Sequence, residues 1–231
     1  MKIGKRVKLA PSIMCANFAN LESDIAQLEE FGVDYLHLDI MDGHFVPNLT
    51  MGPDVVKSIR KITDLKLDTH LMVEYPEKYI TTFVESGADL ISLHVESPGN
   101  IQSALRQIRK AGREGAIALN PETPVKDVEK YLESVSVVLM MCVKPGLAGR
   151  ELVKGSIEKI GEMKRRIDDL GLDIEIQVDG NVGGGNMRRM IEAGADILVC
   201  GTSSIFQPGL SLEDGLSSLT SELWSIGSHL G

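Results

Sequence analysis

Short apolar runs alternate with amphipathic segments along the whole chain. Eight runs have the length of buried strands, and they span residues 8–13, 34–39, 66–72, 89–94, 115–119, 136–143, 173–179 and 196–200. Between the runs, apolar residues recur every three or four positions, which is the period of a helix with one buried face. Two clear sets are Leu21, Ile25, Leu28, Phe31 and Ile101, Leu105, Ile108. The same pattern predicts further helices over residues 52–61, 76–86, 124–133, 151–170, 184–193 and 212–226.

The alternation of strands and helices predicts a parallel sheet, because parallel neighbours need a crossover connection. Eight strand–helix units in 231 residues predict a closed (β/α)8 barrel, the TIM-barrel fold. No linker, low-complexity segment or change of composition divides the chain, so residues 1–231 are expected to form one domain. The competing interpretation is an open doubly wound sheet, which needs a switch point and usually has fewer strands.

Histidines and aspartates occupy the predicted C-terminal ends of three strands. His37 and Asp39 stand two residues apart and share one face of their strand, while His70 and Asp179 come near the ends of two others. In a barrel these ends converge on one mouth, where the chemistry takes place. Two imidazoles and two carboxylates form a ligand set suited to a divalent cation such as Zn2+, Fe2+, Mn2+ or Co2+. The alternative is that each is a hydrogen-bonded structural group, and sequence spacing alone does not decide between the two.

The two aspartates also suit proton transfer. The strands that carry Asp39 and Asp179 lie on different sides of a barrel, so the carboxylates are expected to face each other across a bound substrate. One carboxylate can remove a proton from a carbon, and the other can return a proton to the opposite face. A metal between them would polarise a carbonyl group and stabilise an enediolate.

Glycine-containing turns follow the last three predicted strands. They cover residues 143–149, 179–183 and 201–204. Barrels often bind phosphate through backbone N–H groups in the loops after the seventh and eighth strands, where glycine allows a close approach and a helix N-terminus adds a favourable dipole. The turns therefore predict a phosphate site. Lys144 and Arg150 could add positive charge there, although solvation at the surface is the simpler interpretation of both.

Three methionines stand at or near strand ends, namely Met41, Met72 and Met141. Methionine usually packs in the core, and that is the simplest interpretation here. The alternative is a soft, dry lining around a reacting carbon, which would disfavour competing reactions with water.

Composition and charge restrict the class of protein. The chain is 43% hydrophobic and 25% charged, which is ordinary for a globular protein, and its net charge of −9 argues against nucleic acid as a partner. Cys15, Cys142 and Cys200 include no CxxC pair and are expected to be reduced thiols of a cytoplasmic protein. No signal peptide is recognised at the N-terminus, and no run of about 18 apolar residues predicts a membrane span.

Four stretches carry a family resemblance: LAPSIM at 9–14, LDIMDGHFVPN at 38–48, THLMV at 69–73 and VDG at 178–180. Through them the chain resembles the ribulose-phosphate 3-epimerase family over nearly its whole length. The resemblance implies a phosphate-binding (β/α)8 barrel with one divalent metal ion. The residues that match the metal ligands of the family are His37, Asp39, His70 and Asp179, and Asp39 and Asp179 match its acid/base pair.

The resemblance also implies the substrate contacts. They are Ser12, His70, Met41, Met72, Met141, Gly146, Leu147, Ala148, Gly149, Gly180, Asn181, Gly201, Thr202 and Ser203. The implied partner is a small ketose phosphate, with neither nucleic acid nor a membrane involved. The resemblance suggests a homo-oligomer, either a dimer or a larger ring of dimers such as a hexamer.

The phosphate turns depart from the usual family pattern. The family typically has Pro-Gly-Phe-Gly-Gly-Gln after the sixth strand, whereas residues 145–150 read Pro-Gly-Leu-Ala-Gly-Arg here. Asn181 replaces the second glycine of an Asp-Gly-Gly turn, and residues 201–203 read Gly-Thr-Ser in place of Ala-Gly-Ser. These last two features, together with residues 119–125, are similar to the allulose-6-phosphate 3-epimerase branch.

The leading expectation is metal-dependent 3-epimerisation that interconverts D-ribulose 5-phosphate and D-xylulose 5-phosphate by two-base proton transfer through a cis-enediolate. The alternative within the family is conversion of D-allulose 6-phosphate to D-fructose 6-phosphate, so the length of the sugar stays open. A lyase on the same barrel is disfavoured, because Lys66 and Lys144 are poorly placed for a Schiff base and a metal-free decarboxylase would not need two strand-end histidines. A non-catalytic sensor would be expected to lose one of the two aspartates.

Overall fold

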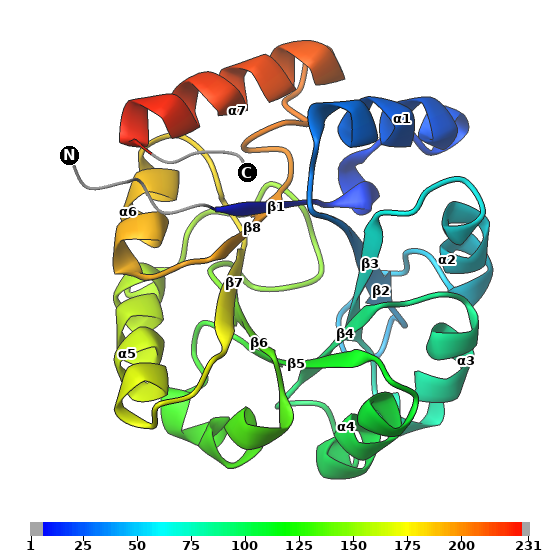
Figure 1. Ribbon diagram of the computed structural model, residues 1–231, viewed down its shortest axis with the longest axis vertical. Coiled ribbons are helices and arrows are strands. Elements are labelled where there is room, and N and C mark those ends of the chain that lie inside the picture. The colour runs from blue at the N-terminus through cyan, green and yellow to red at the C-terminus, as the bar shows by residue number, and fades with distance from the viewer. Residues whose placement is uncertain (1–6, 228–231) are drawn as a thin grey trace.

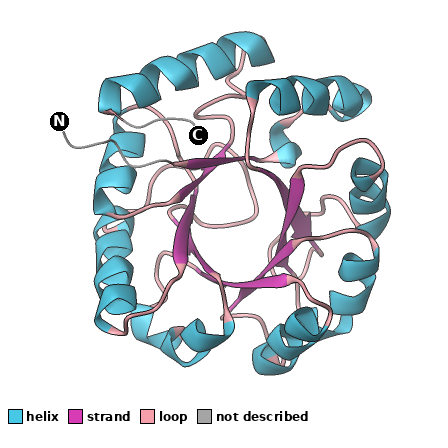
Figure 2. Ribbon diagram, viewed as in Figure 1, coloured by secondary structure: helices cyan, strands magenta, loops and turns pink. Residues whose placement is uncertain are grey.

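The computed structural model describes residues 7–227 of the 231-residue chain. The first six and last four residues of the expected single domain lie outside the described residues. The same holds for the first part of the N-terminal segment, in which no signal peptide is recognised. Figure 1 shows a ring of strands with helices around its outside, and Figure 2 shows the same two layers by secondary structure. None of the helices in the described part is long and apolar enough to cross a membrane.

Eight parallel strands form the barrel. They are β1 (Lys8–Pro11), β2 (Tyr35–Met41), β3 (Lys66–Met72), β4 (Leu90–His94), β5 (Glu114–Leu119), β6 (Val137–Met141), β7 (Glu175–Asp179) and β8 (Ile197–Cys200). Neighbours follow in the order β1-β8-β7-β6-β5-β4-β3-β2, and a parallel bridge between Ser12 and His37 connects the two outer members. The predicted (β/α)8 barrel is therefore confirmed, and the competing open sheet is wrong.

The α-helices of the described residues cover the outside of this ring. They are α1 (Leu21–Phe31), α2 (Pro53–Arg60), α3 (Ile80–Glu85), α4 (Ile101–Lys110), α5 (Ser156–Asp169), α6 (Gly185–Ala193) and α7 (Leu212–Ile226). The spacing of three and four predicts their buried faces well. In α4, for example, Ile101, Leu105 and Ile108 are all buried.

One predicted α-helix is wrong. Residues 124–133 fold into two 3₁₀ segments, Val125–Asp127 and Glu129–Ser134. These segments follow Pro124, whose backbone is extended, and each is short. Tighter i→i+3 turns suffice there to bury Tyr131. The fifth strand–helix unit thus keeps its connection but not its α-helix.

Two other predicted helices begin late. The helix expected over residues 151–170 starts at Ser156, because Gly155 has a left-handed φ of +87° that an α-helix cannot include. The helix expected over residues 76–86 opens with a 3₁₀ turn, Pro76–Lys78, before α3 begins. Periodicity alone does not reveal where such a segment changes its backbone conformation.

The two faces of each strand meet different surroundings. On β2, Leu36 and Leu38 belong to the apolar core between strands and helices, whereas His37 and Asp39 point into the barrel. A separate apolar cluster that includes Tyr35 fills the barrel at the N-terminal ends of the strands. The cavity described below accordingly opens at the C-terminal ends.

Candidate active site

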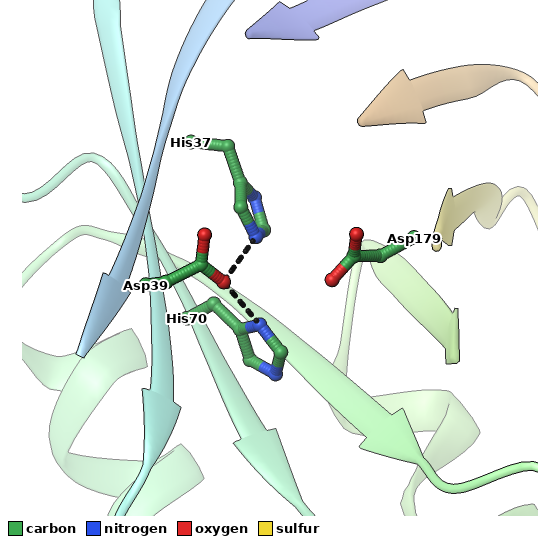
Figure 3. A group of neighbouring side chains, drawn as sticks. All are labelled: His37, Asp39, His70 and Asp179. Atoms are coloured by element: carbon green, nitrogen blue, oxygen red, sulfur yellow. Dashed lines mark hydrogen bonds and ion pairs between the residues drawn. The ribbon is translucent and has the colours of Figure 1, made fainter. Parts of the chain in front are cut away.

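Four side chains from three strands meet inside the barrel. His37 and Asp39 come from β2, His70 from β3 and Asp179 from the end of β7, and each offers one ligand atom within 4.8 Å of the others. Figure 3 shows the two histidines beside Asp39, with Asp179 facing them from the other side. The structure thus brings together the four residues predicted as metal ligands.

The register of β2 and β3 places these groups in layers. His37 lies beside Asp68, and Asp39 lies beside His70, in the parallel pairing of the two strands. Side chains two residues apart share a face, so both pairs point into the barrel. His37, Asp68 and His70 are fully buried, and Asp39 is 4% exposed. Groups this deeply buried need polar partners, which the cluster supplies.

Close polar contacts hold the cluster in one arrangement. Asp39 Oδ1 lies 3.3 Å from both His37 Nε2 and His70 Nδ1, and Asp39 Oδ2 accepts a hydrogen bond from Ser12 Oγ at 2.7 Å. On the other side of His37, Nδ1 lies 2.6 Å from Asp68 Oδ2, which also accepts a hydrogen bond from Gln177 Nε2. One carboxylate, that of Asp39, therefore contacts both imidazoles and Ser12.

The two aspartates differ widely in acidity. Burial would raise the pKa of Asp39, but His37 and His70 together hold this pKa far below its usual range. Burial and the nearby charge of Asp39 raise the pKa of Asp179 to about 7. Environments that separate the pKa values of two neighbouring carboxylates are typical of acid/base pairs.

The donor set fits a divalent transition-metal ion. His37 Nε2 is buried and has no hydrogen-bond partner among the described residues. Leaving a buried polar atom unsatisfied is costly, and a cation would satisfy this nitrogen together with His70 and the two aspartates. Two nitrogen and two oxygen donors suit Zn2+, Fe2+, Mn2+ or Co2+ better than Mg2+ or Ca2+, which prefer oxygen.

A cavity of about 360 Å³ adjoins the cluster at the C-terminal ends of the strands. Asp39 and Asp179 line the cavity together with most of the predicted substrate contacts. Those contacts on its wall are Ser12, Met41, Met72, Met141, Gly146, Leu147, Ala148, Gly149, Gly180, Asn181, Gly201, Thr202 and Ser203. His70 is the one predicted contact that does not line the cavity, because it lies fully buried beside Asp39.

The methionines make one side of the cavity apolar. Met41, Met72 and Met141 are at most 5% exposed, and the first two pack with Val46. All three also line the cavity. The same three side chains thus pack in the core and line the cavity.

The loops after β6, β7 and β8 approach one another closely. A methyl group on Gly183 would lie 1.9 Å from the backbone oxygen of Ser203, so only glycine fits between the last two loops. Asn181 has a left-handed φ of +55°, and its amide donates a hydrogen bond to the backbone oxygen of Arg150 at 3.1 Å. Asparagine tolerates this backbone region better than most residues. Asn181 can therefore occupy a turn where the family has glycine, and it joins the loops after β6 and β7.

The loop after β2 forms another part of the rim. Asp42 Oδ1 accepts hydrogen bonds from the backbone N–H groups of His44 and Phe45, which fixes the turn. Further along, the Asn48 amide donates a hydrogen bond to the backbone oxygen of Gly146 at 2.8 Å. The loop therefore reaches across the mouth and supports the turn after β6.

Four buried or partly buried polar residues around the cluster are not singled out by the sequence pattern. Asp68 and Gln177 contact each other beside His37, while His94 and Glu96 lie behind His70. The period of two could have identified the first pair, because each stands two residues before a predicted ligand on the same face. No such signal marks His94 and Glu96, since β4 carries no predicted ligand.

Comparisons with known proteins identify the family of the chain. A family model described as the ribulose-phosphate 3 epimerase family matches residues 8–206. The ribulose-phosphate 3-epimerase of Bacillus subtilis (strain 168) is 42% identical over 198 residues, which cover 85% of this chain and 91% of that protein. The ribulose-phosphate 3-epimerase of Escherichia coli (strain K12) is 37% identical over 205 residues, which cover 88% of this chain and 91% of that protein.

Solved structures of more distant proteins share the fold. A mutant α-subunit of tryptophan synthase from Pyrococcus furiosus has a TM-score of 0.69 at 15% identity, covering 94% of this chain and 99% of that one. The 3-hexulose-6-phosphate synthase of Salmonella typhimurium has a TM-score of 0.66 at 14% identity, covering 95% of this chain and 100% of that one. At these identities the likeness extends to the fold alone.

Proposed function

Because the chain belongs to the ribulose-phosphate 3-epimerase family, and is thus an epimerase of the isomerase class, we propose that it interconverts D-ribulose 5-phosphate and D-xylulose 5-phosphate. The observation that carries this proposal is the position of Asp39 and Asp179, which line one cavity from different sides of the barrel (Figure 3). Inversion at a carbon requires that a proton leaves one face and another arrives on the opposite face. Two carboxylates placed in this way meet that requirement.

The proposed reaction divides the work among a few side chains. One of the two aspartates, Asp39 or Asp179, removes the proton from carbon 3, and the other returns a proton to the opposite face of the planar cis-enediolate. Ser12 donates its hydrogen bond to Asp39 Oδ2 and fixes the orientation of that carboxylate. The methionine wall limits the access of water to the reacting carbon.

The metal site would be formed by His37, Asp39, His70 and Asp179, and the proposed ion is Zn2+, Fe2+, Mn2+ or Co2+. When bound, such an ion supplies Lewis-acid stabilisation of negative charge on the substrate oxygens. The buried Nε2 of His37, which makes no hydrogen bond within the described residues, and the mixed nitrogen and oxygen donors support this assignment.

Removal of the metal tests this assignment. We expect dialysis against a strong chelator to lower the turnover rate by at least about 100-fold, because Lewis-acid stabilisation contributes several kcal/mol to a transition state. Titration with Mn2+, Co2+, Fe2+ or Zn2+ should restore turnover and identify the preferred ion. Full activity in protein whose metal content is negligible by elemental analysis would contradict the assignment.

The phosphate is proposed to bind at the turns after β6, β7 and β8. Residues 146–149, 180–181 and 201–203, which belong to these loops, line the cavity. Their close packing supports the proposal, since a phosphate needs several N–H groups that converge on one point. Arg150 also lines the cavity and could add positive charge to the site.

A methyl group on Gly183 tests the phosphate turns. The Gly183→Ala substitution should lower kcat/KM on the order of 100-fold, because the new Cβ would push the loop after β7 away from Ser203 by more than an ångström. Steady-state kinetics on either pentose phosphate measures this effect. Gly185→Ala is the matched control, since a methyl group there meets no atom within 4 Å. Equal kinetics for the two variants would contradict the proposed role of these turns.

The length of the sugar is tested directly by proton NMR in D2O. Metal-loaded enzyme is incubated separately with D-ribulose 5-phosphate and D-allulose 6-phosphate, and the carbon-3 hydrogen and the epimer signals are followed. We expect the faster exchange and epimerisation with the five-carbon substrate. A faster reaction with the six-carbon substrate would instead assign the protein to the allulose-6-phosphate branch, and no exchange with either would reject 3-epimerisation.

A cytoplasmic homo-oligomer is also part of the proposal. Cys142 and Cys200 are buried free thiols, which suits a reducing compartment. Exposed apolar side chains follow the strands at the C-terminal rim of the barrel, and Leu49 and Leu147 are 73% and 45% exposed. Exposed apolar side chains in these loops support an interface at that rim. Light scattering coupled to size-exclusion chromatography would give the number of subunits.

A further inference from the structure

A line of polar side chains lies behind His70. His94, the last residue of β4, places its Nε2 2.9 Å from His70 Nε2, and its own Nδ1 lies 3.0 Å from Glu96 Oε2. Both imidazoles are fully buried, and the ring of Phe45 packs against His94 at 4.8 Å. The line from Glu96 through His94 thus ends at the ring of a proposed metal ligand.

Glu96 is anchored as a carboxylate. Its Oε1 accepts hydrogen bonds from the Asn120 backbone N–H at 2.7 Å and from the Thr123 hydroxyl. Both donors favour the ionised form, which can only accept hydrogen bonds. The contact between Glu96 Oε2 and His94 therefore requires that His94 Nδ1 carries a proton and donates it.

The proton on His94 Nδ1 fixes the next hydrogen bond. A neutral imidazole with its proton on Nδ1 has an acceptor lone pair on Nε2. His70 must then donate from its own Nε2, so that its Nδ1 carries a lone pair. The 3.3 Å contact between His70 Nδ1 and Asp39 Oδ1 then joins two acceptors and is not a hydrogen bond, an arrangement that a cation held by both atoms would stabilise. Asp68 has the same effect on His37, the other proposed histidine ligand. It accepts a hydrogen bond from His37 Nδ1, so the lone pair available to a metal lies on His37 Nε2.

We propose that Glu96 and His94 are positioning residues that set the tautomer of His70, so that its Nδ1 is presented as a metal ligand. The inference rests on the proposed metal-dependent function and extends it to residues outside the cavity. Carboxylates that orient a metal-binding histidine from behind typically contribute a factor of about 10 to 100 to metal affinity. In this chain the orientation would pass through a second histidine.

An isosteric substitution, Glu96→Gln, tests the relay. When the amide oxygen keeps the bonds from Asn120 and Thr123, the amide NH2 faces His94 Nδ1. Nδ1 then becomes the acceptor, and both imidazoles switch tautomer. We expect the metal dissociation constant, measured by competition with a chelating dye, to rise by about 10- to 100-fold. Thr123→Val is the matched control, because it removes one bond to the same carboxylate while the charge and the contact with His94 remain.

The tautomers themselves are read by 15N NMR of the histidine rings in metal-free protein. The chain has five histidines, and spectra of single variants assign them. The expected wild-type pattern is a proton on His70 Nε2 and on His94 Nδ1, reversed in Glu96→Gln. A wild-type His70 protonated on Nδ1 would overturn the relay even if Glu96→Gln does not fold. The relay would also be overturned if Thr123→Val weakens metal binding as much as Glu96→Gln does.

These measurements distinguish failure of the proposed relay from failure of the proposed metal-dependent function. A wild-type protein that binds no divalent metal rejects the metal-dependent function, whatever the tautomers. A wild-type protein that binds metal and epimerises its substrate, but shows the opposite tautomers, rejects only the relay.

Discussion

Asp179→Asn is expected to lower kcat for epimerisation by about 10²- to 10⁴-fold while the barrel stays folded, because the substitution keeps the shape of the side chain and removes its ability to carry a proton. Asp39 and Asp179 are the carboxylates that line the cavity within the described residues, and Asp39 reaches it from β2. No other described carboxylate can therefore replace Asp179 on the β7 side. Steady-state kinetics with metal-loaded protein measures the loss. Elemental analysis of the same sample shows whether the variant still holds its metal.

The pattern of hydrogen exchange distinguishes the two-base mechanism from general damage. With Asp179 removed, Asp39 still reaches one face of carbon 3. The variant should therefore exchange the carbon-3 hydrogen of one pentose phosphate with D2O and leave the other epimer unchanged. Asp173→Asn, an exposed substitution just before β7, is the control and should behave as wild type. Exchange of both epimers by the Asp179 variant, or epimerisation at the normal rate, would falsify the two-base assignment.

The strands could be predicted closely from the sequence because a parallel barrel buries both faces of each strand. The run predicted at 66–72 matches β3, and the run at 89–94 differs from β4 by one residue. The least accurate segment was 124–133, where the amphipathic spacing is real but the backbone forms 3₁₀ turns. Periodicity reports which side of a segment is buried, and it does not report which hydrogen bonds the backbone makes.

The candidate site could be predicted only in its first layer. Strand ends of a barrel converge, so the positions of Asp39 and Asp179 in the sequence were enough to place them at one mouth. The layer behind it depends on which strands are neighbours and in what register, and an isolated sequence does not contain that information for His94 and Glu96. His94 meets His70 because β3 and β4 are paired, although 24 residues separate them in the chain.

Asp68 is expected to be the most important polar residue for stability in the barrel interior. It is fully buried, lies 2.6 Å from His37 Nδ1, and also accepts a hydrogen bond from Gln177. Asp68→Ala would leave both donors buried without a partner. Breaking a buried charged pair from one side typically costs about 3–5 kcal/mol, which corresponds to a fall of roughly 10 °C in the thermal midpoint of a chain of this length.

The matched control for Asp68 is an ion pair at the exposed start of the strands. Glu114 of β5 pairs with Lys66 of β3 at 2.7 Å, but the two side chains are 42% and 50% exposed. Exposed pairs contribute at most about 1 kcal/mol, so Glu114→Ala should shift the thermal midpoint by only a few degrees. Both variants are best compared in chelator, so that loss of metal does not add to the difference. If Asp68→Ala unfolds at the same temperature as Glu114→Ala, the interior network does not stabilise the barrel, and the buried pair serves only to orient His37.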